Sequence, residues 1–449
     1  MTLTFARLLA RPMLALPTVF AAVASTASAQ ARPPIRPLGA VHASTTDSLG
    51  TINNVRALPG GRLLINDATS RRVLLVDSTF KLISIVADST SSTANAYGPR
   101  SGSLIAYRGD STLFVDAASL SMLVIDPAGK IGRVMSVPRS QDAMMLAAGG
   151  LGTGAYYSNG YLVYRGMPGF RMQMGPTGAP TMPSVADTMA IVRVNLQSRA
   201  VDTVGFIKIP KTNTNMTRSD DGKISISIEV NPLPVVDDWV VTSTGDVALI
   251  RGKDYHVDWM SPDGTHRSSP KMAFDWKRLS DEQKVALIDS VKAIRDRAAA
   301  ANPGQGNAMA AAFGAALGTG GGAGGAAPQM VMRFESRGGP GGAPGGGAAP
   351  QIMAPQINYV SPSELPDYQP AFFATSAKAD DDGNIWIRTI ATKPTPGGAV
   401  YDVVNAKGEV VDRVQIPENR TIVGFGAGGV VILAVREGMT TKLERARAR

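Results

Sequence analysis

The sequence predicts an all-β protein, a six-bladed β-propeller whose blades are four-stranded antiparallel sheets. Residues 51–87 contain four short apolar runs separated by turn-forming residues, and the same plan recurs 49 residues further along the chain. A hairpin turn containing Gly or Asn also recurs, each time directly before an apolar strand. The six turns are Gly60-Gly61, Gly109-Asp110, Asn159-Gly160, Thr244-Gly245, Asp382-Gly383 and Gly428-Gly429. A four-stranded unit that repeats every ~45–50 residues buries its faces only by stacking on its neighbours, which indicates a ring of blades.

The first and last units show how the ring is expected to be built. The apolar runs of the first unit cover residues 51–58, 62–67, 72–77 and 81–87. Its first turn is rich in Gly, which adopts the positive φ of tight hairpins at low cost. The last unit, from Thr421 onward, has room for only three strands. We expect Arg36–Ser44 to supply the missing outer strand, so that both ends of the chain close the ring and no open edge remains.

Two segments resemble a known repeat family. Residues 53–87 are similar to an NHL-type repeat, with a Gly-turned hairpin, an Asp at the strand end, an Arg-Val strand start and an outer strand, and residues 399–436 are similar in the same way. The whole chain resembles the secreted six-bladed propeller proteins of bacteria, related in form to NHL and TolB-like propellers. This resemblance implies an architecture, and the fold hosts binders, assembly platforms and several classes of enzyme.

The first 29 residues have the composition of a secretory signal peptide. Arg7 and Arg11 form a basic start, an apolar stretch follows, and Ala27-Ser28-Ala29 offers the small residues that a signal peptidase requires. The apolar stretch is about a dozen residues long and is interrupted by Pro17, whereas a membrane-spanning helix needs ~20 apolar residues. We therefore expect cleavage after Ala29 and a periplasmic or secreted protein that does not span the membrane.

Composition excludes several classes of function. The chain has no Cys, so it forms no disulfide and has no thiolate nucleophile or metal ligand. Its net charge of +9 is spread along the sequence, with no dense basic tract interleaved with aromatic residues. We therefore expect no nucleic-acid partner. The three histidines are too few for a multi-histidine metal site.

Three insertions interrupt the regular blades. They cover residues 166–189, 206–232 and 271–369. In an up-and-down blade the second-to-third connection and the blade-to-blade connection lie on the same rim, so all three insertions are expected on one face. Loops on a rigid scaffold usually carry recognition, although tolerated surface insertions would look the same in sequence. The predicted organisation is a signal peptide (1–29), blades one to four (30–270), the large insertion (271–369) and blades five and six (370–449).

The large insertion is predicted to begin with a helix and to continue as a disordered tether. Ser280 and Gln283 form a capping-box pattern before an apolar stripe at helical spacing, which predicts a helix over 281–300. Gly, Ala and Pro then make up most of residues 302–355, a composition that buries too little surface to offset chain entropy.

The expected function is non-catalytic binding of a protein, peptide or glycan by a monomeric propeller. The candidate partner-binding residues are apolar side chains of two insertions: Leu287, Val291, Ile294, Met167, Met172 and Met174. Thioethers also bind Cu(I), but no Cys or His lies near these methionines, so a flexible apolar lid over the channel is the favoured interpretation.

Candidate catalytic and metal-binding residues are few. Asp380–Asn384 and Ser219–Gly222 are interpreted as turns, because neither has the ligand spacing of a calcium loop. His256 alternates with Asp254 and Asp258 on one strand and is interpreted as an ordinary surface histidine. No catalytic residue and no cofactor is therefore assigned. The alternative is a calcium-dependent hydrolase or lactonase at the channel mouth, for which the candidate ligands are Asn53, Asn54 and Asn384.

Overall fold

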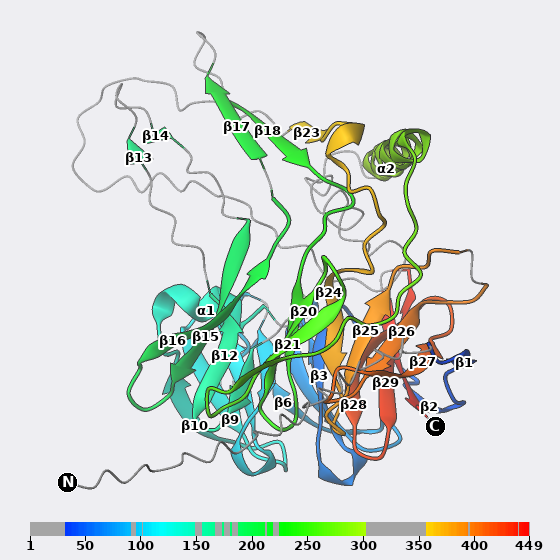
Figure 1. Ribbon diagram of the computed structural model, residues 1–449. Helices are drawn as coiled ribbons and strands as arrows, with labels where there is room; N and C mark the ends of the chain where they lie inside the picture. Colours follow the sequence, from blue (N-terminus) through cyan, green and yellow to red (C-terminus); the bar gives the residue numbers. More distant parts are fainter. Residues whose placement is uncertain are drawn as a thin grey trace, which may run out of the picture.

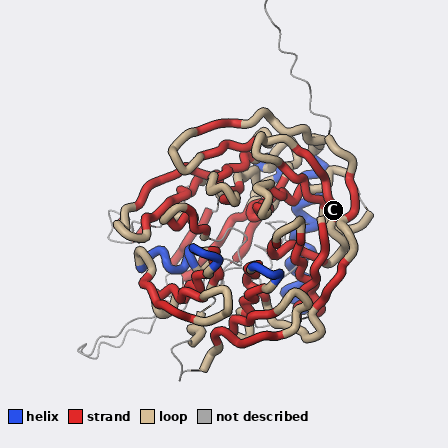
Figure 2. Tube along the Cα trace, turned by 90° about the horizontal axis from the view of Figure 1, so that it is seen from below, coloured by secondary structure: helices blue, strands red, loops and turns tan. Residues whose placement is uncertain are grey.

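The chain forms a ring of six β-sheets with an additional layer of insertions on one side (Figure 1). The computed structural model describes residues 32–90, 96–100, 102–148, 155–166, 173–174, 180–181, 187–211, 213–218, 224–301, 356–393, 396–438 and 440–448. Viewed from below, the sheets are arranged around a common axis (Figure 2). The predicted six-bladed propeller is therefore confirmed.

Six blades make up the ring in chain order, each built on four antiparallel strands. Blade 1 contains β3 (Ile52–Ala57), β4 (Leu63–Asp67), β5 (Arg72–Val76) and β6 (Leu82–Ala87). Blade 2 contains β7 (Ser103–Ala106), β8 (Thr112–Asp116), β9 (Ser121–Ile125) and β10 (Ile131–Ser136). Blade 3 contains β11 (Tyr156–Ser158), β12 (Tyr161–Arg165), β15 (Thr188–Asn195) and β16 (Val201–Lys208). Blade 4 contains β19 (Asp238–Val241), β20 (Val247–Arg251), β21 (His256–Met260) and β22 (His266–Ser268). Blade 5 contains β24 (Phe372–Ala379), β25 (Ile385–Thr389), β26 (Val400–Val404) and β27 (Val410–Gln415). Blade 6 contains β28 (Arg420–Gly426), β29 (Val430–Glu437) and β30 (Thr440–Arg447), with an outer strand from the N-terminal segment.

The N-terminal segment is shared between two blades. β2 (Val41–Ser44) pairs antiparallel with β30 as the outer strand of blade 6. β1 (Ile35–Pro37) pairs parallel with β27 and adds a fifth strand to blade 5, where the sequence had predicted one continuous closing strand from residue 36. The chain crosses between the blades at Leu38 and Gly39. Leu38 is buried between blades 5 and 6, and a Cβ on Gly39 would come within 2.6 Å of the Arg447 carbonyl oxygen.

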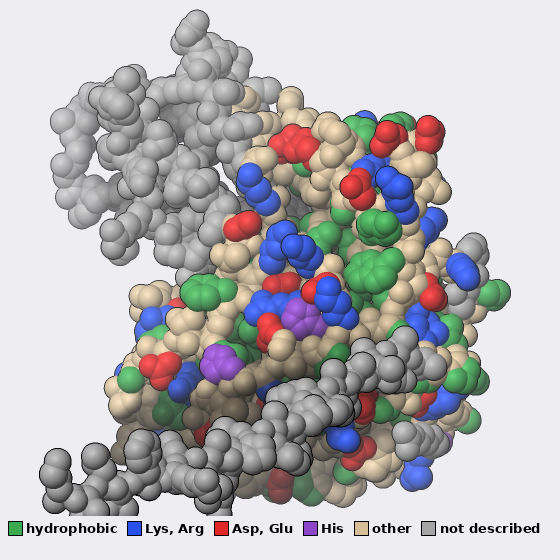
Figure 3. Space-filling model, viewed as in Figure 1, with side chains coloured by type: hydrophobic (Ala, Val, Ile, Leu, Met, Phe, Trp, Pro, Cys, Tyr) green, Lys and Arg blue, Asp and Glu red, His purple; other side chains and the backbone are tan. Residues whose placement is uncertain are grey.

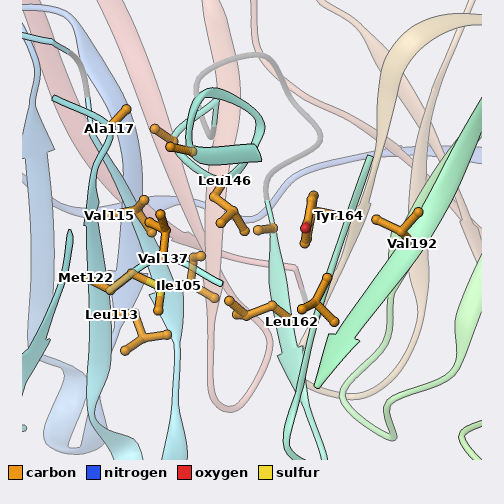
Figure 4. Packing of buried hydrophobic residues seen from close by; sticks show 14 residues of the cluster. Ile105, Leu113, Val115, Ala117, Met122, Val137, Leu146, Leu162, Tyr164 and Val192 are labelled. Atoms are coloured by element: carbon orange, nitrogen blue, oxygen red, sulfur yellow. The ribbon is translucent and has the colours of Figure 1, made fainter. Parts of the chain in front are cut away.

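Each pair of neighbouring blades shares one buried apolar cluster. Alternate side chains of the central strands face opposite neighbours, as the two-residue period of a strand requires: Leu113 and Val115 pack toward blade 3, and Phe114 packs toward blade 1. Figure 4 shows the cluster between blades 2 and 3, which is covered by the short helix α1 (Ala143–Leu146). Burial of these clusters is the main stabilising contribution to the ring.

The second and third insertions form one layer above the ring. β17 (Asn213–Arg218) and β18 (Ile224–Val230) form a hairpin, and β23 (Gln356–Tyr359), which lies more than 120 residues later, pairs parallel with β18. The helix α2 (Asp281–Ala301) packs against this layer through a cluster that contains Ile288 and Leu365. The strands were not expected from the sequence, because the two partners are far apart in the chain and neither is long.

The remaining elements are short. β13 (Gln173–Met174) pairs with β14 (Pro180–Thr181) within the blade 3 insertion. Single 3-10 turns are η1 (Pro59–Gly61), η2 (Arg108–Asp110), η3 (Ser140–Asp142) and η5 (Pro362–Glu364). The capping box of α2 is formed as the sequence pattern predicts, since the Ser280 N–H donates to Gln283 Oε1 at 3.1 Å and the Gln283 N–H donates to Ser280 Oγ at 3.3 Å. In the ranges given above, no helix combines the length and the apolar character of a membrane span. Residues 1–29 and 302–355 lie outside those ranges.

One glycine of blade 4 is expected to be essential for packing. A Cβ on Gly252 would lie 1.9 Å from the Val236 carbonyl oxygen, and backbone cannot yield as a flexible side chain can. We expect Gly252→Ala to lower the free energy of unfolding by roughly 1–3 kcal/mol, the range for overpacked sites, in urea denaturation. Gly132→Ala is the control, because its Cβ would meet nothing within 4 Å. Equal effects of the two substitutions would contradict the expectation.

Candidate functional site

Four polar side chains on the inner two strands of three consecutive blades are linked by their electrostatic influence on one another. Tyr156 begins β11, Arg165 ends β12, Asp238 begins β19, and Lys378 lies in β24. Asp238 acts electrostatically on the other three side chains. We call these four residues the axial cluster. Arg165 and Asp238 mark strand ends on the rim that faces the insertion layer, where β13, β14, β17, β18, β23 and α2 all lie on one side of the ring (Figure 1).

Asp238 is the buried centre of the axial cluster. Asp238 is 2% exposed to solvent. Oδ1 accepts the Trp239 N–H at 2.9 Å and Oδ2 accepts the Ala377 N–H at 2.8 Å, and the nearby N–H groups of Ser376 and Thr375 also stabilise the ionised carboxylate. Burial raises the pKa of Asp238 from its ordinary 3.8 to about 6, although the four backbone hydrogen bonds act in the opposite direction.

The donors on β24 are presented by an irregular stretch of strand. Phe372 pairs with Thr389 and Ala377 pairs with Ile387, so the four residues 373–376 lie opposite the single residue Arg388 of β25. Within this bulge Thr375 has φ 64°, a left-handed conformation that is strained for a β-branched residue. Bulges and strained backbone are concentrated near functional sites, where they turn groups toward a common point.

The two cations of the axial cluster are Arg165 and Lys378. Arg165 and Lys378 are half-buried, and burial lowers the pKa of each, while the nearby charge of Asp238 acts in the opposite direction. Neither side chain forms an ion pair or a hydrogen bond with any residue that the structure describes. Burial also raises the pKa of Tyr156, and the charge of Asp238 adds to this effect. The cluster therefore combines a fixed carboxylate with a guanidinium and an ammonium that have no hydrogen-bond or ion-pair partner among the described residues.

The apolar residues proposed from the sequence as partner-binding lie elsewhere. Val291 is buried, and Leu287 packs on the cluster that joins α2 to the insertion layer, whereas Ile294 is 46% exposed. Met174 lies in β13. Met167 and Met172 lie outside the described residues. None of the described ones belongs to the axial cluster.

The three asparagines proposed as calcium ligands are engaged in local hydrogen bonds. Asn54 bonds the backbone of Leu104 through both its amide nitrogen and its amide oxygen, and Asn53 donates to the Gly102 carbonyl oxygen. Asn384 donates to Asp380 within its own hairpin turn. Across the described ranges, no three His, Cys, Asp or Glu side chains are grouped as a metal site requires. These asparagines therefore hold strands and a turn.

His256 lies in a charged network of blade 4. Its Nδ1 is 2.7 Å from Asp254 Oδ1, and its Nε2 is 3.3 Å from Asp258 Oδ1. Burial would raise the pKa of Asp258, but hydrogen bonds from Ser268 and Arg251 outweigh it and lower that pKa. On the face in Figure 3 the histidines lie among acidic and basic side chains. Both ring nitrogens of His256 therefore face carboxylates of its own strand region.

Sequence patterns gave little indication of the axial cluster. Its members are spread over more than 220 residues, and none lies in a motif. The one available signal is a mismatch in length: FFATSAKA fills an eight-residue strand, whereas its partner strand β25 has five residues. Such a mismatch indicates a bulge, but not which side chain the bulge serves.

No family model matches this sequence, and no curated protein matches it. Solved structures with a similar chain path include a DUF4221-family protein from Bacteroides vulgatus (9% identity, covering 92% of this chain and 96% of that chain, TM-score 0.41). Others are a gluconolactonase from Xanthomonas campestris (11% identity, 93% and 97%, TM-score 0.33) and the calcium-binding protein regucalcin from Agrobacterium tumefaciens (11% identity, 92% and 98%, TM-score 0.36). The assignment of the fold therefore rests on the six sheets of this chain.

Proposed function

We propose that the protein binds a ligand carrying a carboxylate or phosphate group, and that Arg165 and Lys378 hold this oxyanion near the axis of the ring. The observation that supports this is a pair of half-buried cations for which the described part of the chain supplies no hydrogen-bond or ion-pair partner. A guanidinium and an ammonium are the groups that recognise oxyanions, and partial burial strengthens each charge-assisted hydrogen bond.

The position of the axial cluster suits a binding platform. Loops on a rigid ring are common places for recognition, and the insertion layer lies on the rim where Arg165 ends its strand. The partner expected from the sequence is a protein, peptide or glycan, and we propose that this partner is acidic. A glutamate-rich peptide and a uronic-acid oligosaccharide can each be tested as competitors of succinate. The one that displaces succinate shows whether the partner is a peptide or a glycan.

Titration with succinate tests the oxyanion proposal. We expect succinate to bind and to raise the melting temperature by mass action, while succinamide, which has a similar shape without charge, does neither. Inorganic phosphate provides the second arm and separates phosphate ligands from carboxylate ligands. Arg165→Met and Lys378→Met should each weaken binding roughly 10- to 100-fold, the equivalent of about 1.5–3 kcal/mol for a hydrogen bond to a charged group.

Arg193→Met is the matched control for these variants. Arg193 is in β15 of the same blade as Arg165, but it already pairs with Asp202 at 3.4 Å. Its replacement should leave the succinate affinity unchanged. Equal binding of succinate and succinamide, or wild-type affinity in the Lys378→Met variant, would contradict the proposal.

A second candidate function is acid–base catalysis of hydrolysis. It is favoured by the pKa of Asp238, about 6, because a general base is most effective when its pKa lies near the working pH. It ranks second because four backbone N–H groups already occupy this carboxylate. Hydrolysis of lactones or aryl esters that is lost in Asp238→Asn would establish it, and assays with calcium and with EDTA would show whether the metal takes part.

A further inference from the structure

The bulge of β24 connects three parts of the molecule. On one side its N–H groups, together with that of Ala377, converge on the Asp238 carboxylate. On another side Phe373, its first residue, packs against the cluster that holds α2 and the insertion layer. Immediately after Ala377 comes Lys378, one of the two cations of the axial cluster. Lys378 pairs with Trp386 of β25 directly after the bulge, so the end of the bulge at Ala377 sets where this regular pairing begins.

The bulge has no other described anchor of comparable strength. Its strand register with β25 is interrupted between Phe372 and Ala377, so the residues between them lack ladder hydrogen bonds to that neighbour. The strained φ of Thr375 disfavours this conformation by itself. A carboxylate, which offers only acceptors, compensates by taking several N–H groups at once.

We infer that Asp238 is a positioning residue of the oxyanion site: its carboxylate holds Ala377 at the end of the bulge of β24, and this contact sets where the next residue, Lys378, lies relative to the axial cluster. This inference rests on the proposed function. The titratable and charged groups that act on Asp238 from the neighbouring strands are Tyr156, Arg165 and Lys378. None of them donates to its oxygens, so the carboxylate is committed to the backbone of blade 5 and to its own strand.

The Asp238→Asn variant separates positioning from simple electrostatics, because the two roles predict opposite signs. The Asn side chain places an NH2 group where a carboxylate oxygen accepted a backbone N–H group. The bulge of β24 then loses this contact, and Lys378 moves away from the axial cluster. We then expect succinate affinity to fall at least roughly tenfold. Loss of a negative charge beside two cations would by itself increase the affinity. Unchanged or tighter binding of succinate by Asp238→Asn would overturn the inference.

The pKa of Lys378 gives a second readout that needs no ligand. It can be followed by NMR of reductively 13C-methylated protein, with Lys378→Arg used to assign the signal. If Lys378 leaves its half-buried place in Asp238→Asn, its pKa rises toward the ordinary value of 10.5, since burial is what lowers it. If the lysine stays, loss of the neighbouring carboxylate lowers its pKa further, which would contradict positioning. A rise in this pKa together with no succinate or phosphate binding by the wild type would support positioning and refute the oxyanion proposal.

Asp116→Asn is the matched control. Asp116 is also a buried carboxylate that accepts backbone N–H groups, from Ala118 and Ser119, but it holds a turn of blade 2. Its replacement should change neither readout. If Asp238→Asn does not fold, the affinity of the wild type for sulfate can be measured as a function of pH instead. Sulfate keeps its charge between about pH 5 and pH 7.5, so a change in affinity over this range reports on the protein. Affinity that falls as Asp238 gains its proton supports positioning, and affinity that rises refutes it.

Discussion

Replacing Asp402 by Asn should lower the free energy of unfolding by about 3–5 kcal/mol, the range for breaking a buried ion pair by changing one partner. Asp402 is fully buried in β26. It accepts Arg413 Nε at 3.2 Å, Arg32 Nη2 at 3.3 Å and the Tyr255 hydroxyl at 3.0 Å. Asn keeps the shape of the side chain but leaves two guanidinium groups beside a neutral amide. Urea denaturation of the two proteins measures the difference.

The exposed ion pair of Asp202 provides the control for this substitution. The Asp202 side chain is 56% exposed and lies 3.4 Å from Arg193, so Asp202→Asn should change the free energy of unfolding by about 1 kcal/mol or less. A similarly small effect of Asp402→Asn would show that the three partners of Asp402 are rehydrated when its charge is lost. The large effect is expected because Arg32 belongs to the N-terminal segment, and Asp402 fastens that segment to blade 5.

The blades could be predicted from the sequence because their determinants are local. The turns at Gly60-Gly61 and Asp382-Gly383 each form where a Gly with positive φ is followed by an apolar strand, and Gly60 and Gly383 have φ of 75° and 82°. Local chemistry of this kind repeats in each unit and reveals the period. The crossing of the N-terminal segment between two blades depends instead on a close contact of Gly39 with Arg447, two residues separated by almost the whole chain.

The axial cluster could not be predicted, because its geometry depends on how blades stack. Asp238 and Ala377 are 139 residues apart and meet only when blades 4 and 5 become neighbours. The parallel pairing of β18 with β23 is hidden for the same reason, since the chain between them includes α2. Sequence patterns identified the face with the insertions as the place to search, but they pointed to apolar residues such as Val291, which is buried.

The pH dependence of stability should reveal the buried carboxylate of Asp238. Its pKa is about 6 in the folded protein and close to 3.8 in an unfolded chain, so between these values the folded state binds more protons. Stability therefore falls as pH rises through this window, because stability rises with pH only where the unfolded state binds more protons. The difference between the two pKa values corresponds to roughly 3 kcal/mol, fully present as a stabilisation below about pH 4 and lost above about pH 6.

Asp238→Asn isolates this contribution, because every other titrating group is common to both proteins. The free energy of unfolding of the variant minus that of the wild type should rise by up to roughly 3 kcal/mol from about pH 4 to about pH 7. Denaturation in urea at several pH values measures this difference. The amide can also change the free energy of unfolding by a constant amount, which is seen at low pH and does not affect the pH-dependent rise. A difference that stays constant would mean that the carboxyl has the same pKa in both states, and hence that water reaches it in the folded ring. A difference that falls would mean that the backbone N–H groups of the bulge stabilise the ionised form more than burial destabilises it.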